Sequence, residues 1–381
     1  MNITLLKQCA NCGACLNACP VNAISIKEDG LFYTPVVDER RCVDCGICVA
    51  SCPIQSDMPS IHPLKAVAGW HKQADVVLGS SSGGMFYGLA QTVLSDGGVV
   101  FAAAYSQDCK TVIFTSTDAV SLDQLQKSKY VESAIGDAFR QIFIELEKDR
   151  RVLFCGTPCQ VAGLRTFLKK DYEKLTTCDF ACGGLPSHKI YRAYLSNLEQ
   201  KYGSVVTSVD FRPKTHGWKR YAVLIDFQNC KRYLRLGVED PYLRSFLYGK
   251  KTVRDYCMDC KFAQCHASDL TIADFWMHRK LSELENFNGI SLILCNTQKG
   301  IDSIEQIKQH YLLQALDVQS ASYNNQLSRA DQKTRDKRND FLRMFEKKGL
   351  DAAYDQTFKD PLHYKIRNLA TRILRYKRRG R

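Results

Sequence analysis

The sequence contains no apolar run approaching the roughly 20 residues that a membrane-spanning helix requires. Its first residues, MNITLLKQCANC, contain no charged leader, no long apolar stretch and no small-residue cleavage site, so we expect no secretory signal. No G-x-G-x-x-G motif follows an expected strand, so a Rossmann-type nicotinamide site is not indicated. Because we expect neither a membrane-spanning helix nor a secretory signal, we expect a cytoplasmic protein.

Cysteine, by contrast, is abundant, with 18 in 381 residues. Disulfides are not expected, because the cytoplasm keeps thiols reduced, and clustered thiols there usually bind metals or perform redox chemistry. Fifteen of the cysteines fall within residues 9–52, 155–182 and 257–265. The other three are expected to be small buried hydrophobic residues: Cys109, Cys230 and Cys295.

The first eight cysteines belong to a duplicated motif. Residues 9–20 read CANCGACLNACP, and residues 42–53 repeat the pattern C-x2-C-x2-C-x3-C-P as CVDCGICVASCP. In this pattern three thiolates hold one [4Fe–4S] cluster, and the cysteine before proline reaches the neighbouring cluster. Zinc knuckles are the weaker alternative, because a zinc site needs no crossed fourth cysteine.

The crossed pattern predicts two ligand sets. One comprises Cys9, Cys12, Cys15 and Cys52, and the other comprises Cys42, Cys45, Cys48 and Cys19. Gly13 and Gly46 would let the backbone approach the inorganic sulfides. Residues 1–60 resemble bacterial-type dicluster ferredoxins, and residues 59–72 are expected to link them to a larger body.

A Ser/Gly-rich stretch opens that body. Residues 79–105 read GSSSGGMFYGLAQTVLSDGGVVFAAAY, which predicts a helix capped at Ser80–Ser82, a turn, and a buried strand over 99–105. The free backbone N–H groups of such a helix start suit a phosphate or the edge of a flavin. A capped core helix explains the stretch equally well.

Two strand-to-helix units follow. Residues 151–169, RVLFCGTPCQVAGLRTFLK, predict a strand over Val152–Cys155, Thr157 as N-cap and Pro158 as first helical residue. Cys159 would lie in the first turn, where the helix dipole is expected to lower a thiol pKa. The pair in CGTPCQ could form a reactive dithiol, supply a metal ligand or pack in the core.

The second unit spans residues 174–199, KLTTCDFACGGLPSHKIYRAYLSNLE. We expect its strand to end at Cys182 and its helix to open at Pro186. Successive units of this kind predict a mostly parallel sheet, in which ligands gather at the carboxyl ends of the strands. The four cysteines of residues 155–182 should therefore lie near that edge.

A further pair, Cys257-x2-Cys260, occurs in RDYCMDCKFAQCHASDLTIADFW (254–276), before an expected strand and Asp274. A single C-x2-C serves zinc, clusters or thiol redox chemistry alike. Because no second pair accompanies it, its remaining ligands must come from elsewhere. The cysteines at the sheet edge can supply them.

Several stretches, taken in order, resemble one family. They are SSSGGMF (80–86), SKYVES (128–133), CGTPCQVAGL (155–164), CGGLPS (182–187), HGW (216–218), CMDCKF (257–262) and SDLTIADFW (268–276). Over residues 65–280 the sequence resembles the beta-subunit family of coenzyme F420-dependent hydrogenases and dehydrogenases, fused here to a dicluster ferredoxin.

The resemblance implies FAD and one further [4Fe–4S] cluster, held by Cys159, Cys182, Cys257 and Cys260. Cys155, Cys178 and Cys265 are then spare, and a swap with any of them stays open. The resemblance also implies candidate FAD-binding residues: Ser80, Ser82, Gly83, Gly84, Lys129, Tyr130, Ser133, Gly156, Thr157 and Asp274. For Lys129, a solvated surface lysine is the plain alternative.

The function so implied is an oxidoreductase that passes electrons between the clusters, FAD and a small organic acceptor. The acceptor would be an F420-like deazaflavin or an unknown substrate, for instance in surface polysaccharide synthesis, and a ferredoxin-like protein would be the redox partner. The alternatives are a non-enzymatic relay to a partner enzyme and a structural zinc protein. Iron and flavin content separate the three.

The C-terminal region is strongly basic. Residues 329–381 hold 17 Lys/Arg against 7 Asp/Glu, a net +10 of the chain's +13. Leu362, Ile366, Leu369 and Ile373 are at helical spacing. The segment is expected to pack on the body with a solvated basic face, or to contact an anionic membrane. Nucleic-acid binding is disfavoured, because no recognised binding fold accompanies the charge.

Together these patterns predict an α/β protein, α+β overall, with a mixed, mostly parallel sheet. We expect a ferredoxin-type domain (1–60), a flavin-binding region (65–145), a region with the third cluster and the flavin and substrate site (146–325), and a basic helical tail (326–381).

Overall fold

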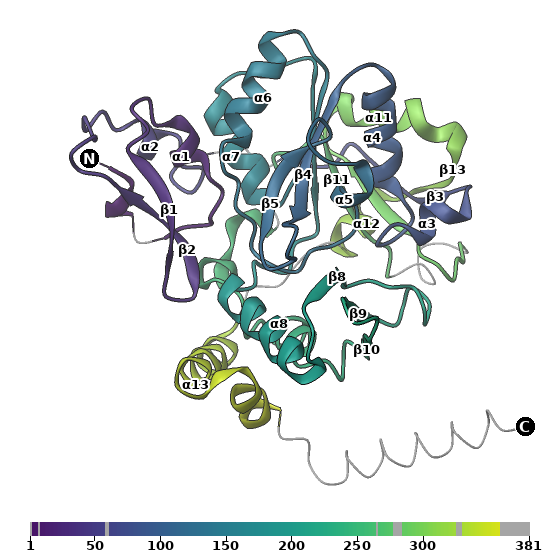
Figure 1. The fold of residues 1–381 in the computed structure, drawn as a ribbon. Helices are drawn as coiled ribbons and strands as arrows, with labels where there is room; N and C mark the ends of the chain where they lie inside the picture. The colour runs from purple at the N-terminus through teal and green to yellow at the C-terminus, as the bar shows by residue number, and fades with distance from the viewer. Residues whose placement is uncertain are drawn as a thin grey trace, which may run out of the picture.

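The computed structural model describes residues 2–6, 8–57, 61–263, 266–276, 284–324 and 330–358. A small N-terminal module lies beside an eight-stranded sheet with helices on both faces, and a three-stranded sheet lies below it (Figure 1). The mixed α/β class expected from the sequence is confirmed. None of the described helices is both long and apolar enough to cross a bilayer.

The N-terminal module repeats its backbone as well as its sequence. It contains the turn η1 (Ile3–Leu5), the antiparallel strands β1 (Ile24–Asp29) and β2 (Phe32–Val37), and the helices α1 (Ala14–Ala18) and α2 (Ile47–Ala50). Gly13 (φ 78°) and Gly46 (φ 73°) each precede a short helix, and Asn11 (φ 54°) and Asp44 (φ 50°) stand two residues earlier. Positive φ is open to glycine and, among other residues, mainly to Asn and Asp.

The large sheet has the strand order β13-β3-β12-β11-β7-β6-β4-β5. Its parallel centre comprises β11 (Leu270–Asp274), β7 (Leu175–Phe180), β6 (Val152–Cys155) and β4 (Val99–Tyr105). Antiparallel strands complete both sides: β5 (Val112–Ser116) on one, and β12 (Ser291–Cys295), β3 (Lys65–His71) and β13 (Tyr311–Leu316) on the other.

The expected linker over residues 59–72 is therefore wrong in its main part. The segment KAVAGWH forms β3, which pairs with β12 and β13 and is buried along most of its length. Its apolar residues serve both faces of the sheet, since Val67 packs on one side and Ala66 and Ala68 on the other. Such two-sided burial produces no polar alternation, which is the usual sequence sign of a strand.

Helices cover both faces of the sheet (Figure 1). On one face lie α4 (Met85–Ser95) and α11 (Gln298–Ile307), and on the other α6 (Ala138–Glu147), α7 (Pro158–Leu168) and α12 (Val318–Asn324). The side chains of β6 alternate between them, because Leu153 faces α4 while Val152 and Phe154 face α6 and α7. The short helices α3 (Ala74–Leu78) and α5 (Leu122–Leu125) and the 3-10 helix η4 (Lys308–His310) also belong to this part.

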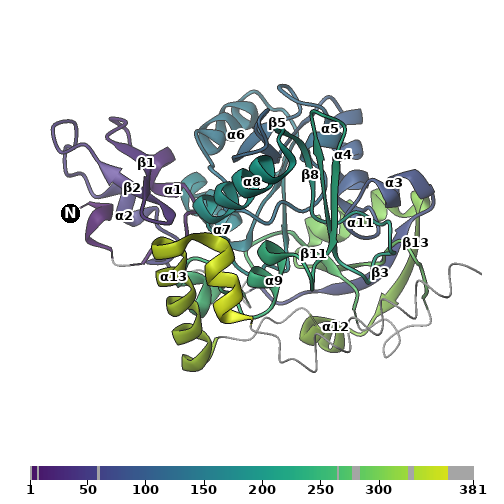
Figure 2. The same cartoon turned by 60° about the horizontal axis from the view of Figure 1, so that its bottom comes forward.

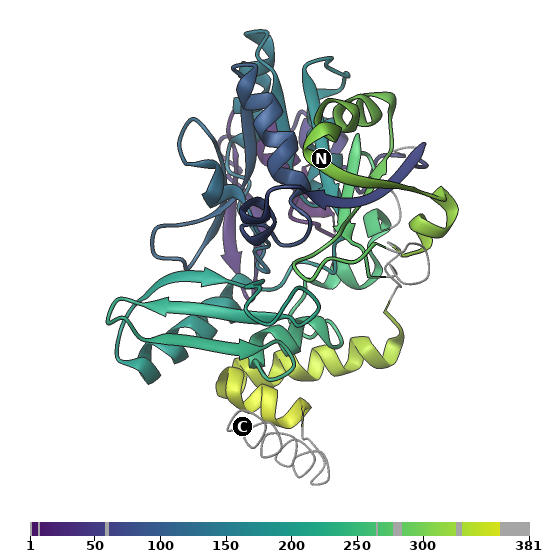
Figure 3. The same ribbon diagram turned by 90° about the vertical axis from the view of Figure 1, so that its right-hand side faces the viewer.

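The lower sheet is an antiparallel meander of β8 (Val206–Asp210), β9 (Ala222–Phe227) and β10 (Arg232–Leu236), seen best in Figure 3. Three helices pack beside it: α8 (His188–Tyr202), α9 (Pro241–Leu247) and α13 (Gln332–Thr357) (Figure 2). Their core is aromatic, with the rings of Tyr194 and Tyr242 stacked 5.2 Å apart.

The described part of the expected basic tail is thus a packed helix. Phe341, Phe345 and Leu350 of α13 are buried in the core of α8 and α9. The helical pattern at Leu362–Ile373 lies outside the described residues.

The N-terminal module is fastened to α6 by Arg140. Its guanidinium donates hydrogen bonds to three carbonyls of the module, those of Asn17 (2.7 Å), Cys19 (2.8 Å) and Leu16 (3.2 Å). A planar guanidinium that satisfies several carbonyls at once holds a fixed orientation. The module is therefore docked on the body through directional bonds.

Several element boundaries agree with the sequence and others differ. The strand over 99–105, the strand Val152–Cys155 and the Thr157–Pro158 helix start are confirmed. The N-cap of α4 is Gly84 (φ 90°), not one of the serines Ser80–Ser82. Two of their hydroxyls are engaged elsewhere, since Ser80 donates to the Val76 carbonyl and Ser82 to the Ile290 carbonyl. The second unit also differs, since β7 ends at Phe180 and Ser187 caps α8.

Of the three isolated cysteines, Cys109 and Cys295 are buried as expected. Cys230 is exposed, so that prediction is wrong. It lies in the tight turn between β9 and β10 with φ 62°, a position fixed by the turn and not by packing.

Candidate functional site

One set of four cysteines gathers where the N-terminal module meets the body. Cys9, Cys12, Cys15 and Cys52 line a common cavity of about 510 Å³. Burial raises the pKa of Cys12 to about 12, and the neighbouring Cys9 and Cys52 add to this rise. The backbone N–H of Asn11 points at the Cys9 sulfur at 3.3 Å. The structure thus brings together the first crossed set that the sequence predicts.

The second set lies at the outer end of the module. Cys19, Cys42, Cys45 and Cys48 line a separate small cavity, and the N–H of Ala23 donates to the Cys19 sulfur at 3.2 Å. Cys45 is exposed. A cluster held here would be the one most accessible to another protein.

The third set forms at the carboxyl edge of the parallel strands. Cys159 stands in the first turn of α7, Cys182 follows β7, and Cys257 and Cys260 lie in and directly after the turn η2 (Asp255–Asp259). Burial and the thiols of Cys257 and Cys260 raise the pKa of Cys182 to about 12. The N–H of Leu185 donates to the Cys257 sulfur at 3.4 Å.

The expected lowering of the Cys159 pKa is wrong. Burial raises this pKa well above its ordinary value, and Cys260 and Cys182 add to the effect. The cost of ionising a buried thiol beside other thiols outweighs the stabilisation that the helix N-terminus gives to a thiolate. Such a thiol needs a positive partner to ionise, and cluster iron is one.

The spare cysteines face elsewhere. Cys155 and Cys178 are paired residues on the adjacent strands β6 and β7, and the neighbouring Cys155 thiol, together with burial, raises the pKa of Cys178 well above its ordinary value. Cys265 lies outside the described residues. The proposed ligand set stays a prediction; it comprises Cys159, Cys182, Cys257 and Cys260. In the structure, Cys155 and Cys178 are neighbours of each other on adjacent strands.

The donor chemistry fits clusters of several irons. Each four-thiol set has only sulfur donors, and each receives a backbone N–H, as cluster thiolates commonly do. Among the described residues, no three His, Cys, Asp or Glu side chains converge closely enough for one metal ion. The thiolates of a cubane surround a larger iron–sulfide core, so they stand further apart than the ligands of one ion.

The first and third sets share a wall. The Cys159 thiol lies 3.7 Å from the Ala10 carbonyl of the N-terminal module. A Cβ added at Gly163 of α7 would lie 3.0 Å from the Cys12 Cβ. Glycine at this position therefore permits the close approach of the module to the helix that carries Cys159.

A group of charged residues lies beyond the third set. Arg212 donates to Asp274 at 2.8 Å and to the Tyr130 hydroxyl at 3.3 Å, and Trp218 Nε1 donates to Asp274 at 3.0 Å. Lys214 donates to the Ser82 carbonyl at 2.7 Å. Three residues expected at a FAD site, Ser82, Tyr130 and Asp274, thus meet around the basic side chains of Arg212 and Lys214. The sequence pattern singled out neither Arg212 nor Lys214.

Two half-buried lysines, Lys214 of this group and Lys129 next to Tyr130 in the chain, have lowered pKa values. Burial, then Arg212, lowers the pKa of Lys214 to about 7, and burial lowers that of Lys129 to about 7. The half-buried Lys129 ammonium donates to the Gln126 carbonyl, so it is not a freely solvated surface lysine. The tryptophans Trp218 and Trp276 stack 4.5 Å apart beside the cations. Flat rings next to cations suit an anionic aromatic ligand.

The other expected FAD residues divide in two. Ser133, Gly156 and Thr157 belong to the wall of the third set: Ser133 accepts from Gln160 (3.0 Å), Gly156 donates to the Cys178 carbonyl (3.1 Å), and the Thr157 hydroxyl contacts the Cys159 sulfur (3.1 Å). In the Ser/Gly stretch the polar groups are engaged within the fold, since the Gly83 N–H donates to Ser291 at 2.9 Å. A Cβ at Gly83 would meet the Gly69 carbonyl at 2.4 Å, so close packing on β3 accounts for this glycine without a ligand.

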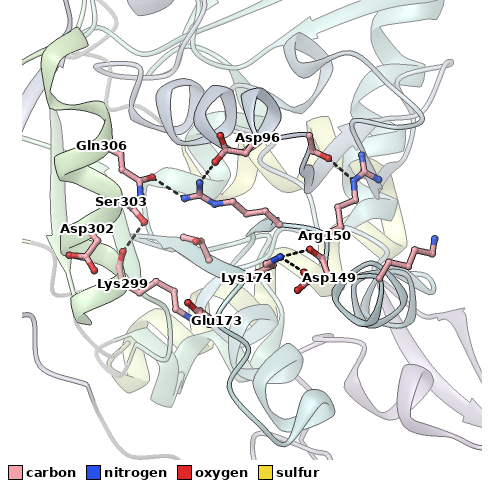
Figure 4. Close-up of a pocket in the computed structure, with 13 residues that line it drawn as sticks. Asp96, Asp149, Arg150, Glu173, Lys174, Lys299, Asp302, Ser303 and Gln306 are labelled. Carbon is pink, nitrogen blue, oxygen red and sulfur yellow. Dashed lines mark hydrogen bonds and ion pairs between the residues drawn. The ribbon is translucent and has the colours of Figure 1, made fainter.

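A cavity of about 710 Å³ lies at the opposite, amino end of the strands (Figure 4). Its charges neutralise one another: Lys174 pairs with Asp149 at 2.5 Å, and Arg151 pairs with Asp96 and donates to Gln306 at 2.9 Å. It contains no cysteine among the described residues that line it. Its position and its paired charges separate it from the cysteine sites.

Two family models match the chain. The model for the C terminus of the beta subunit of coenzyme F420 hydrogenase/dehydrogenase matches residues 149–320, and a 4Fe-4S dicluster domain matches residues 8–56. No curated protein matches the sequence. A chain of the xenon-derivatised F420-reducing [NiFe] hydrogenase complex from Methanosarcina barkeri is 14% identical, with a TM-score of 0.45. The match covers 71% of this chain and 91% of that one, and it is too distant to carry an argument.

Proposed function

We propose a flavin-dependent role for this chain, which is an iron–sulfur protein of the electron-transfer oxidoreductase type. Residues 149–320 belong to the family defined by the C terminus of the beta subunit of coenzyme F420 hydrogenases and dehydrogenases, and residues 8–56 form a 4Fe-4S dicluster domain. In the proposal, electrons pass between the two ferredoxin-type clusters, a third [4Fe–4S] cluster and FAD, to or from a small organic acceptor.

The serial placement of the three cysteine sets carries the proposal. The outer set reaches the surface at Cys45, and the inner set meets the third across Ala10 and Cys159. From there, Gly183 beside Cys182 lies against Phe246, whose ring packs 5.3 Å from that of Tyr130. These contacts support the proposal that the line of redox sites ends at the Arg212–Asp274 group.

That group suits an anionic redox cofactor. Arg212, paired with Asp274, carries a fixed positive charge, and Lys214, whose pKa is lowered to about 7, adds a second when it is protonated. The stacked tryptophans supply a flat apolar face. When bound, a flavin exchanges electrons singly with clusters and in pairs with organic molecules. We propose that Arg212 and Lys214 hold the anionic part of FAD or of the acceptor. The acceptor would be either an F420-like deazaflavin or an unknown substrate, for instance one used in surface polysaccharide synthesis.

The partners follow from the two ends of the path. A ferredoxin-like redox protein would dock near the exposed Cys45 and exchange single electrons there. The small acceptor would enter at the sheet edge near the partly exposed Trp276. Contact of the basic residues 359–381 with an anionic membrane is part of the proposal and falls outside the described residues.

Cofactor content tests the proposal. We expect anaerobically purified full-length protein to contain about twelve irons, equal sulfide and one FAD per chain, as three cubanes and a flavin require. Eight irons without flavin would overturn the flavoenzyme and favour a relay that passes electrons to a partner enzyme. A colourless zinc protein would contradict both.

A screen of acceptors then identifies the substrate class. The reduced protein is mixed anaerobically with a deazaflavin, a nicotinamide and a quinone, and reoxidation of the clusters is followed optically. Rapid reoxidation by one class alone is expected. Three clusters and FAD with no reoxidation by any small acceptor, but rapid reoxidation by a protein partner, would again favour the relay.

A further inference from the structure

A buried polar network joins the N-terminal module to the body between the first and third cysteine sets. At its centre is Glu132, whose side chain is fully buried. Its carboxylate lies 2.6 Å from His188 Nδ1 and accepts from Arg254 at 3.0 Å, from the Tyr33 N–H at 3.2 Å and from Asn11 at 3.4 Å. Tyr33 and Asn11 belong to the module, and Arg254 and His188 belong to the body. The network therefore crosses the junction.

Arg254 lies between the two cysteine sets. It lines the cavity of the first set, and it is three residues from Cys257, whose N–H donates to the Arg254 carbonyl at 3.1 Å. Burial disfavours its charge, but Glu132, Cys9 and Cys257 outweigh burial, and the pKa of Arg254 stays above its ordinary value. One fixed cation therefore acts on a thiol of each set.

One donor of this guanidinium has no partner. Nη2 donates to Glu132 and to the Tyr33 carbonyl, whereas Nε is buried without a hydrogen-bond partner among the described residues. Buried donors in folded proteins are nearly always paired. A sulfur of a cluster bound in the cavity of the first set, which Arg254 lines, would provide the missing acceptor.

We propose that Arg254 sets the reduction potentials of the two clusters on either side of it, with Glu132 acting in opposition. The part concerning the third cluster rests on the proposed function, and the part concerning the Cys9 cluster rests on the dicluster domain. A cluster gains one negative charge on reduction, so a nearby cation favours the reduced form and a nearby anion disfavours it. Net charge and hydrogen bonds to sulfur are the protein's usual means of tuning such potentials.

Removing the positive charge of Arg254 and removing the negative charge of Glu132 should shift the reduction potentials in opposite directions. In Arg254→Met, the ratio of reduced to oxidised cluster at a fixed potential is expected to fall about tenfold, equivalent to about 59 mV for one electron. In Glu132→Gln, the ratio is expected to rise. Arg254→Lys retains the charge and should remain close to wild type. The potentials are measured by EPR-monitored redox titration of the full-length protein.

Two references are available within the chain. Cys19, Cys42, Cys45 and Cys48 line a cavity whose lining does not include Arg254, so the potential of the outer cluster that they would hold should not change. Arg343→Met removes the same charge from an exposed residue that pairs with Asp340, and it should leave every potential unchanged.

The outcomes separate tuning from a structural role. Unchanged potentials in Arg254→Met and Glu132→Gln, or shifts in the same direction, would overturn the proposal. If Arg254→Met loses a cluster, the potentials of Arg254→Lys and Glu132→Gln still decide between tuning and a structural role. If the wild type has only eight irons, the proposed function fails, while the cluster held by Cys9 still tests Arg254.

Discussion

Replacing Cys159 by alanine is expected to remove one cluster of three. Its thiol is buried beside Cys182 and Cys260, and the substitution leaves only three thiols around the proposed third cluster. Iron content should fall from about twelve to about eight per chain, with a matching loss of sulfide. The ferredoxin-type clusters should persist, because their ligands lie in a different module.

The matched control is Cys155→Ala, four residues earlier in the same CGTPCQ segment. Cys155 faces Cys178 across adjacent strands and not the four-thiol set, so this variant should keep its twelve irons. Both variants remove one sulfur, and any general weakening of the fold should appear in both.

The assay is iron and sulfide analysis of anaerobically purified protein, with EPR of the reduced state. Cys159→Ala with twelve irons and Cys155→Ala with eight would exchange the roles of the two residues and refute the ligand assignment. Unchanged iron with altered thiol reactivity in Cys159→Ala would instead make Cys159 a redox thiol.

Two further predictions concern the charged group at the sheet edge. Asp274→Asn leaves Arg212, only 4% exposed in its side chain, without its ionic partner; unfolding free energy should fall by about 3–5 kcal/mol, and bound flavin should be lost. Equal stability in a denaturant titration would contradict the pairing. The pKa of Lys214 is about 7 when folded and near 10.5 when unfolded, so the unfolded chain binds more protons between these values and stability should rise with pH there. Thermal unfolding at pH 7 and 9 should show a smaller rise in Lys214→Met, and an identical rise would refute the low pKa.

The sequence was sufficient for features that depend on local spacing. The duplicated cysteine motif, the helix start at Thr157 and Pro158, and the strand at 99–105 each follow from short-range rules, and the structure contains all three. Positions at element ends were less predictable. Ser187 caps α8 by accepting from the Ile190 N–H, a choice between neighbouring polar residues that spacing does not determine.

The buried charges could not be predicted from the sequence. Glu132 and Arg254 stand within or beside stretches that the sequence singles out for other residues, and Arg212 and Lys214 stand in an unremarkable one; nothing local marks any of the four as buried. Their burial results from the docking of distant segments, as when Tyr33 and Asn11 meet Glu132 about a hundred residues away. Only the tertiary arrangement reveals that these residues lie beside the cysteine sets.

The docking of the N-terminal module on α6 and α7 has a kinetic consequence. Arg140 donates hydrogen bonds to three carbonyls of the module, and Gly163 allows the module to lie against the helix that carries Cys159. Clusters held by the module would therefore keep a fixed position on the body and would not swing between a donor and an acceptor as a tethered domain does. Transfer inside the chain should be independent of protein concentration and solvent viscosity, and only the encounter with an external partner should depend on either.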